Sequence, residues 1–205
     1  MTNQTDRPYR KNVAKQGLIY MGGKELEVLI KNYSISGLLA ELTGEHQYLE
    51  VKDIYQAISN CPVLDFYIPE MRMSGEVDVV RVDIEDSRIL MALNFKYVSH
   101  DVDQCLYQRK AYRKLMSATG KILLEDIFID FETINVSIDG LMIRLLDNVE
   151  VNAGTITAFR FRQLGLEGAV KVVWVEHADG TTLLGLEYIR MSRTQIEGIP
   201  VFAKR

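Results

Sequence analysis

The chain has little of what marks secreted, membrane-spanning or polyanion-binding proteins. Its 205 residues include only two cysteines, Cys61 and Cys105, which make neither a disulfide framework nor a CxxC metal pair, so a reducing cytoplasm is expected. No apolar run approaches the roughly 20 residues that span a bilayer, and residues 1–10 are too polar for a signal peptide. The formal net charge of −4 argues against broad binding to nucleic acid polymers. We therefore expect a soluble, cytoplasmic protein without membrane insertion.

The patterns of catalytic and metal centres are also missing. His46, His100 and His177 are scattered, without the spacing of metal ligands. Neither a Gly-x-Ser-x-Gly elbow nor a Walker loop occurs, and the carboxylates of 125–130 alternate with apolar residues as on the exposed side of a strand. We predict no catalytic residue, no metal and no cofactor, and hence a protein that is not an enzyme.

An internal repeat is the strongest pattern present. Residues 9–40 align without gaps with 112–143, an offset of 103, and share 10 identities, where chance gives about two. Residues 75–95 align with 168–188 at an offset of 93, so the first copy carries ten extra residues, which we place within 45–61. Two gapless blocks in the same order indicate a duplication. We expect two domains, at 1–100 and 101–205.

The local pattern predicts mainly β-structure. Runs rich in β-branched residues at 77–84 and 170–175 are typical of strands, and Asp179-Gly180 is typical of a tight hairpin turn. Short strands with regularly spaced turns favour a small barrel or sandwich in each copy. Two amphipathic segments are expected to be helical instead, 101–116 at the junction and 49–58 in the first copy's insertion.

Two polar motifs stand out in the second copy. Arg109 and Arg113, four apart, can direct two guanidinium groups at one phosphate or purine. About 20 residues later come Asn135, Ser137 and Gly140, a pattern that closes a turn through side-chain bonds to the backbone. Each motif alone is more often a solvated basic face or a structural turn, whereas their combination on a β-rich background is more specific.

This combination resembles the PilZ domains, which bind the bacterial second messenger cyclic di-GMP. Their signature is RxxxR followed by [Asp/Asn]-x-Ser-x-x-Gly. The resemblance implies a six-stranded antiparallel barrel per copy, with the arginines on a flexible segment that folds over the ligand, and the nucleotide as ligand rather than cofactor. Arginine suits both its phosphates and its guanines, and Ser137 would donate to phosphate or brace the turn. The implied ligand-binding residues are Arg109, Lys110, Arg113, Asn135, Ser137 and Gly140.

The first copy departs from the signature. Asp6 stands at the repeat position of Arg109, which leaves Arg7 and Arg10 three apart. Arg7 with Lys11 restores the spacing, but lysine lacks the forked geometry of arginine. A second site would comprise Arg7, Arg10, Asn32, Ser34 and Gly37. The other interpretation is that this copy is a docking or dimerisation surface.

The leading hypothesis is a bacterial cyclic di-GMP receptor. Binding would order the junction around Arg109 and Arg113, change how the two barrels pack, and so alter contacts with a protein partner. The alternative is a PilZ-like scaffold that binds no nucleotide and acts on flagellar, pilus or other envelope machinery by protein contact. Trp174, inside a β-branched run, is interpreted as a core residue rather than a stacking platform.

Overall fold

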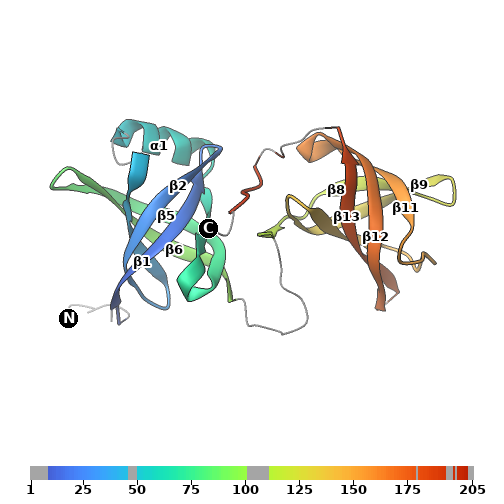
Figure 1. Ribbon diagram of the computed structural model, residues 1–205, viewed down its shortest axis with the longest axis horizontal. Coiled ribbons are helices and arrows are strands. Elements are labelled where there is room, and N and C mark those ends of the chain that lie inside the picture. Colours follow the sequence, from blue (N-terminus) through green and yellow to red (C-terminus); the bar gives the residue numbers. More distant parts are fainter. Residues whose placement is uncertain are drawn as a thin grey trace, which may run out of the picture. The chain divides into compact units, whose positions relative to one another are not determined.

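The chain divides into two compact units, each built around a six-stranded antiparallel barrel with a hydrophobic core of its own (Figure 1). The computed structural model describes residues 9–45, 50–100, 111–178, 180–192, 196 and 198–202. The two barrels have the same strand order, as a duplication requires. The mainly β architecture predicted from the sequence is therefore confirmed.

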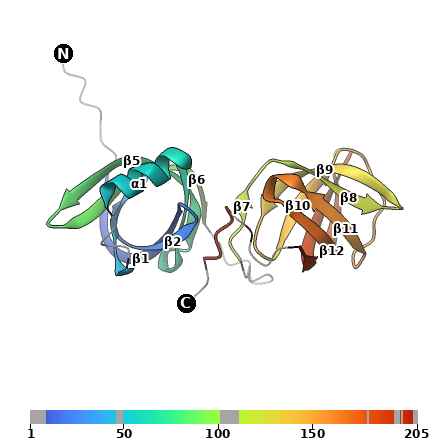
Figure 2. The ribbon, with the colours of Figure 1, turned by 90° about the horizontal axis from the view of Figure 1, so that it is seen from above.

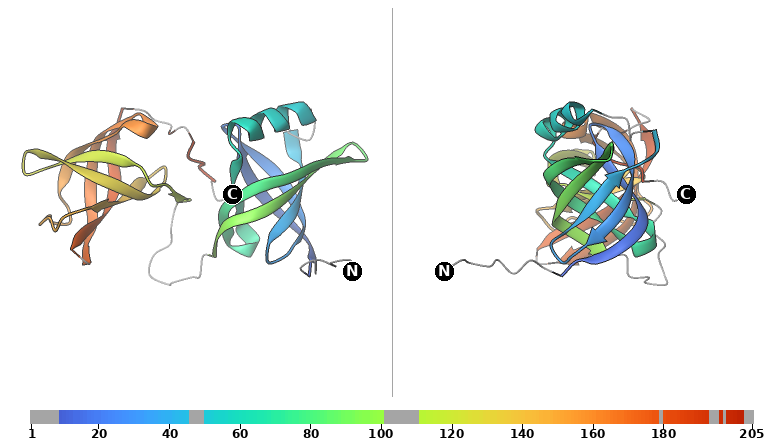
Figure 3. Two further views of the ribbon diagram at one scale, coloured as in Figure 1. Left: turned by 180° about the vertical axis from the view of Figure 1, so that it is seen from behind. Right: turned by 90° about the vertical axis from the view of Figure 1, so that its left-hand side faces the viewer.

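The first barrel closes in the order β1-β2-β3-β6-β5-β4. Its strands are β1 (Lys11–Met21), β2 (Lys24–Tyr33), β3 (Gly37–Leu42), β4 (Val63–Ile68), β5 (Met73–Glu85) and β6 (Arg88–His100). Buried side chains alternate with more exposed ones along β1 and β2, because successive side chains of a strand point to opposite faces of the sheet. The inward set fills the core. The long β5–β6 hairpin extends past the neighbouring strands (Figure 3).

The second barrel repeats this topology. Its strands are β7 (Lys114–Leu115), β8 (Thr119–Leu124), β9 (Ile127–Val136), β10 (Gly140–Leu145), β11 (Ile156–Phe161), β12 (Leu166–Ala178) and β13 (Thr181–Met191). The order β8-β9-β10-β13-β12-β11 is closed by the pairing of β11 with β8, and β7 adds to the edge of β9. Each strand thus has its counterpart in the first barrel, with β7 and β8 together matching β1.

Smaller landmarks recur at the repeat offsets. A 3-10 turn follows β4 as η2 (Pro69–Met71) and β11 as η3 (Arg162–Leu164), and each ends at a left-handed residue, Arg72 or Gly165. An aromatic pair is also kept, Phe66 with Phe95 in the first core and Phe159 with Tyr188 in the second. Such recurrence within the alignment supports duplication of one domain.

The ten-residue insertion of the first copy is the helix α1 (Val51–Asn60), as predicted. It is amphipathic: Ile54 is fully buried in the barrel core, with Ala57 and Ile58 beside it. This spacing of i, i+3 and i+4 puts the three on one face. Seen from above, α1 lies across one end of the ring of strands (Figure 2).

The predicted junction helix over 101–116 is wrong in its last part. Lys114–Leu115 form strand β7, which pairs with β9, whereas 101–110 lie outside the described residues. The apolar spacing of Tyr112, Leu115 and Met116 fits a helix locally, but the open edge of β9 offers backbone hydrogen bonds that satisfy the same segment as a strand.

Candidate functional site

The turn between β9 and β10 carries the Asn-x-Ser-x-x-Gly motif of the second barrel. Ser137 is buried, with 3% of its surface exposed. Its hydroxyl Oγ donates to the carbonyl oxygen of Gly140 at 3.1 Å and accepts the backbone N–H groups of Asp139 and Gly140 at 3.3 and 3.2 Å. The serine therefore braces the turn, one of the two roles foreseen for it.

Gly140 is required by close packing of backbone against backbone. A Cβ at this position would lie 2.0 Å from the carbonyl oxygen of Leu186 on β13, and a Cβ at Gly37 would meet Leu93 on β6 at the same distance. Ser34 also repeats the turn, with its N–H donating to the carbonyl of Gly37 at 2.8 Å. The serine and glycine of both motifs are therefore used within the barrels.

Strand β7 brings the basic segment to this turn. Lys114 pairs with Val136 and Leu115 with Asn135, so the antiparallel register, continued by one residue, sets Arg113 opposite Ser137. Arg113 is exposed. The described end of the RxxxR motif, Arg113, thus lies beside the turn that carries the second motif.

A β-bulge occurs at the same place in both repeats, and in the second barrel it separates β7 from β8. In the first barrel the register slips by one residue between Asn12 and Lys15. In the second, the hydroxyl of Thr133 bridges the break: it donates to the carbonyl of Met116 at 2.6 Å and accepts the N–H of Ala118 at 3.0 Å. A bulge re-aims the side chains that precede it, here the segment that carries the arginine.

Asn135 is the polar residue of the motif whose side chain is not fully hydrogen-bonded among the described residues. Its side-chain amide contacts the Met142 sulfur at 3.6 Å, and its buried oxygen Oδ1 has no hydrogen-bond partner among the described residues. A buried acceptor left in this state is costly in a folded protein. It is therefore a point at which a ligand donor would be stabilising.

Trp174 is the residue that sequence reasoning missed. The pairing registers define one transverse row of the barrel, Leu115, Asn135, Met142, Gly185 and Trp174. The neighbours of Gly185 in β13, Leu184 and Leu186, are buried in the core, so Gly185 points to the outer face, where the indole lies against it. The core interpretation is therefore wrong, and the register shift between Val172 and Trp174 is the reason.

The match to a family model decides the identity of this unit. Residues 107–200 match the model described as the PilZ domain. Residues 107–200 are a PilZ domain. The match begins just before Arg109 and spans the motif turn and all the strands of the second barrel, so the resemblance inferred from the signature is confirmed for the second copy.

Solved structures were also compared with the whole chain, and three are representative. The chain is 11% identical to the Borreliella burgdorferi PlzA protein in complex with c-di-GMP, covering 94% of this chain and 90% of that one, with a TM-score of 0.34. It is 12% identical to the Bacillus subtilis inhibitor of motility MotI/DgrA, covering 89% of this chain and 90% of that one, with a TM-score of 0.37. It is 13% identical to Escherichia coli YcgR in complex with c-di-GMP, covering 86% of this chain and 76% of that one, with a TM-score of 0.33. A comparison with curated proteins found no match.

The predicted site residues of the PilZ domain fall into two groups. Arg113, Asn135, Ser137 and Gly140 lie together at the β7–β9–β10 corner, whereas Arg109 and Lys110 lie outside the described residues. In the first barrel Arg10 is exposed at the repeat position of Arg113, next to the corner that holds Asn32, Ser34 and Gly37, and Arg7 lies outside the described residues. The described helices include none long and apolar enough to cross a membrane.

Proposed function

We propose that the PilZ domain binds cyclic di-GMP at the corner formed by β7, β9 and β10, and that the protein is a receptor without a catalytic step. The observation that carries the proposal is the pairing of β7 with β9, which sets the end of the RxxxR segment beside the Asn-x-Ser-x-x-Gly turn. Two of the compared PilZ structures contain this nucleotide. The ligand is an anion with two flat guanines, which matches the chemistry of paired arginines.

Each residue of the corner has a distinct role in this proposal. Arg109 and Arg113 bind phosphate or the O6/N7 edge of guanine through their guanidinium groups. Asn135 accepts a hydrogen bond at its Oδ1, which is buried without a partner among the described residues. Ser137 and Gly140 hold the turn that positions Asn135, and Lys110 adds positive charge. Trp174, in the same transverse row, offers an indole face within reach of a bound base.

Binding would act through the segment that joins the two barrels. Arg109 and Arg113 belong to that segment, so the nucleotide restricts it and favours one arrangement of the two barrels over others. A ligand shifts such an equilibrium only by its difference in affinity for the two arrangements. A protein partner that recognises one arrangement would then respond to the nucleotide.

The first barrel is the weaker binder in this proposal. Its corner keeps Asn32, Ser34 and Gly37, but Asp6 replaces one arginine of the pair, and its transverse row ends in Arg81 where the second has Trp174. Arg81 is already paired with Asp83 at 2.8 Å. This asymmetry supports one nucleotide site per chain, with the first barrel contributing a contact surface for a partner or a second copy.

Calorimetric titration with cyclic di-GMP tests the proposal on the full chain. Arg109→Ala and Arg113→Ala should each weaken binding about 10- to 100-fold, because a charge-assisted hydrogen bond contributes about 1.5–3 kcal/mol. Arg88→Ala, at an exposed position in the first barrel, is the control and should bind like wild type. Trp174 is the only tryptophan, so its fluorescence gives a second readout at the proposed site.

The outcomes separate the alternatives. Unchanged affinity in both arginine variants would disprove the assignment to the PilZ domain. No binding by the wild-type chain would favour the scaffold hypothesis, in which the fold is kept for protein contacts alone. A stoichiometry of two nucleotides together with a loss of affinity in Arg10→Ala would show that the first barrel also binds.

A further inference from the structure

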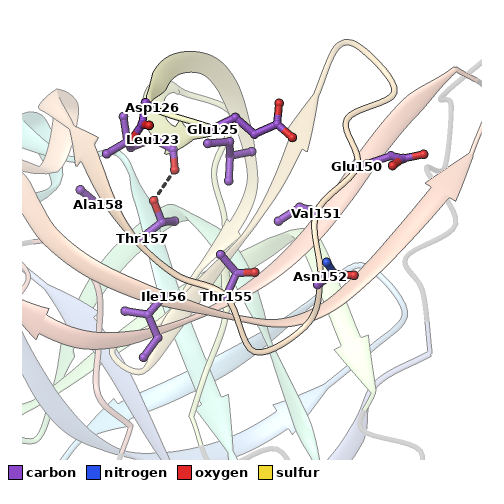
Figure 4. Close-up of a pocket in the computed structure, with 11 residues that line it drawn as sticks. Leu123, Glu125, Asp126, Glu150, Val151, Asn152, Thr155, Ile156, Thr157 and Ala158 are labelled. Carbon is purple, nitrogen blue, oxygen red and sulfur yellow. Dashed lines mark hydrogen bonds between the residues drawn. The ribbon is translucent and has the colours of Figure 1, made fainter.

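The second barrel has a surface cavity at the end opposite the signature turn. The cavity has a volume of about 530 Å³ and lies between the β8–β9 turn and the chain that leads into β11 (Figure 4). Leu123, Val151 and Ile156 give it apolar walls, and Glu125, Asp126 and Glu150 supply carboxylates. The hydroxyl of Thr157 donates to the carbonyl of Leu123 and fixes one wall. The proposed nucleotide site does not use this cavity.

The first barrel shows what covers the equivalent place. There, α1 packs on the β1–β2 turn: a Cβ built on Gly22 would lie 3.4 Å from the Cβ of Ala57, and Ile54 is fully buried. At the repeat offset of 103, Gly22 and Gly23 correspond to Glu125 and Asp126, which are in the cavity wall. A short amphipathic helix is therefore the shape that fits this end of the barrel.

The second barrel lacks that helix. The chain from β10 to β11, residues 146–155, contains no helix, and it is held against the barrel by Thr182, whose hydroxyl accepts the N–H of Val149 at 2.9 Å and donates to the carbonyl of Asp147 at 3.1 Å. Within the described part of the second unit, no helix takes the place of α1. Val149 and Val151 of this chain pack against the core, and the cavity beside them is open to solvent.

Exposed apolar side chains lie next to the carboxylates at this end of the second barrel. Ile127 is 67% exposed, Phe128 37% and Ile156 62%. The first two occupy the repeat positions of Lys24 and Glu25. Ile156 lines the cavity, whereas Ile127 and Phe128 follow the β8–β9 turn that forms one of its walls, and the Arg160 guanidinium lies over the Phe128 ring.

We propose that this cavity binds an amphipathic helix of a protein partner, with basic residues flanking its apolar face. The apolar face would occupy the place that Ile54 and Ala57 occupy in the first barrel. The basic residues are required because the carboxylates of Glu125, Asp126 and Glu150 border the cavity, and an acidic helix would be repelled. The inference stands on the duplication and is independent of nucleotide binding.

A designed peptide provides a defined probe. It has the sequence of residues 50–61 with Glu50→Lys, Asp53→Lys and Gln56→Glu. A lactam joins the side chain of Lys52 to the new carboxylate at position 56 and keeps the peptide helical, since so short a helix is marginal in water. Titration into the ¹⁵N-labelled full chain, up to about 1 mM, should give saturable shifts at Glu125, Asp126, Val151 and Ile156. Ile156→Lys and Glu125→Lys should each weaken binding at least tenfold.

Two controls make the result decisive. Ile189→Lys changes an equally exposed isoleucine on β13 and should leave peptide binding unchanged. A peptide of the same composition and with the same lactam, but with Asp53→Ile and Ile54→Lys in place of Asp53→Lys, breaks the apolar face and should not bind. All the chain variants alter exposed side chains, and thermal unfolding checks that they fold. Absence of saturable shifts, or shifts centred elsewhere in the folded protein, would overturn the proposal.

Discussion

The serine and glycine of the repeated signature have the same structural role in the two barrels. The serine and glycine close the same turn in both, with the same close approach of the glycine to a carbonyl oxygen of the opposite strand. The asparagine is the exception, because the oxygen of Asn135 is buried without a partner in the described residues. The serine and glycine of the signature are therefore structural, and the ligand contacts that we propose involve the asparagine and the arginines.

Tyr188 offers a test at this scale. Its hydroxyl is buried without a hydrogen-bond partner among the described residues, and burial raises the pKa of the Tyr188 phenol above its ordinary value of about 10. The folded state then holds the proton more tightly than the unfolded state. Stability is therefore complete below about pH 10 and falls as the pH rises further.

Tyr188→Phe should remove this alkaline loss and cost no stability at neutral pH, since it deletes an unsatisfied group and keeps the ring against Phe159. Phe95 already occupies the equivalent place in the first barrel. Urea unfolding at pH 7 and pH 10.5 measures the effect, with the exposed Tyr97→Phe as control. Equal alkaline sensitivity of Tyr188→Phe and wild type would contradict the burial argument.

At the scale of elements, the short strand β7 is what connects the basic segment to the signature turn. It contains two residues and depends on the bridge from the hydroxyl of Thr133 to Met116 and Ala118. The first barrel has Ile30 at this repeat position and a continuous β1 with a bulge instead. The same register slip is thus stabilised in two ways.

Thr133→Val should loosen β7 selectively. The substitution keeps the shape but leaves the N–H of Ala118 and the carbonyl of Met116 short of a partner, at a cost of about 1–3 kcal/mol. We expect faster hydrogen exchange at Met116 and Ala118, and weaker nucleotide binding because Arg113 loses its support. Exchange measured by NMR checks the first, calorimetry the second. Ile30→Val in the first barrel is the matched control and should change neither.

The elements also show where sequence reasoning succeeds and fails. In the sequence, the β-branched runs and the gapless repeat identify strands. The change of offset between the two aligned blocks places the helix α1. These signals can be recognised because they are local or recur within the chain. The strand at 114–115 and the outward position of Trp174 depend on a bulge and on pairing with distant strands, which local spacing does not encode. The signature turn was foreseen, whereas the transverse row that includes Trp174 required the registers.

For the whole molecule, the two cores share no residue, so each barrel has its own source of stability. The matched glycines Gly37 and Gly140 allow each to be weakened separately, because a Cβ at either would lie 2.0 Å from a backbone oxygen. Gly140→Ala should lower the free energy of unfolding of the second barrel, and Gly37→Ala that of the first, each by more than about 2 kcal/mol. In scanning calorimetry, the transition that moves to lower temperature in each variant is assigned to the barrel that carries the substitution.

Nucleotide should then stabilise only one of the two assigned transitions. At a free concentration 100 times the Kd, cyclic di-GMP should stabilise the second barrel by about 2.7 kcal/mol, because binding to the folded state alone adds RT ln(1 + [L]/Kd). The first barrel should not respond, since Asp6 takes the place of an arginine in its motif. A shift of both transitions would mean either that both corners bind or that the nucleotide couples the two barrels. Arg10→Ala separates these, because it abolishes the first shift only in the former case.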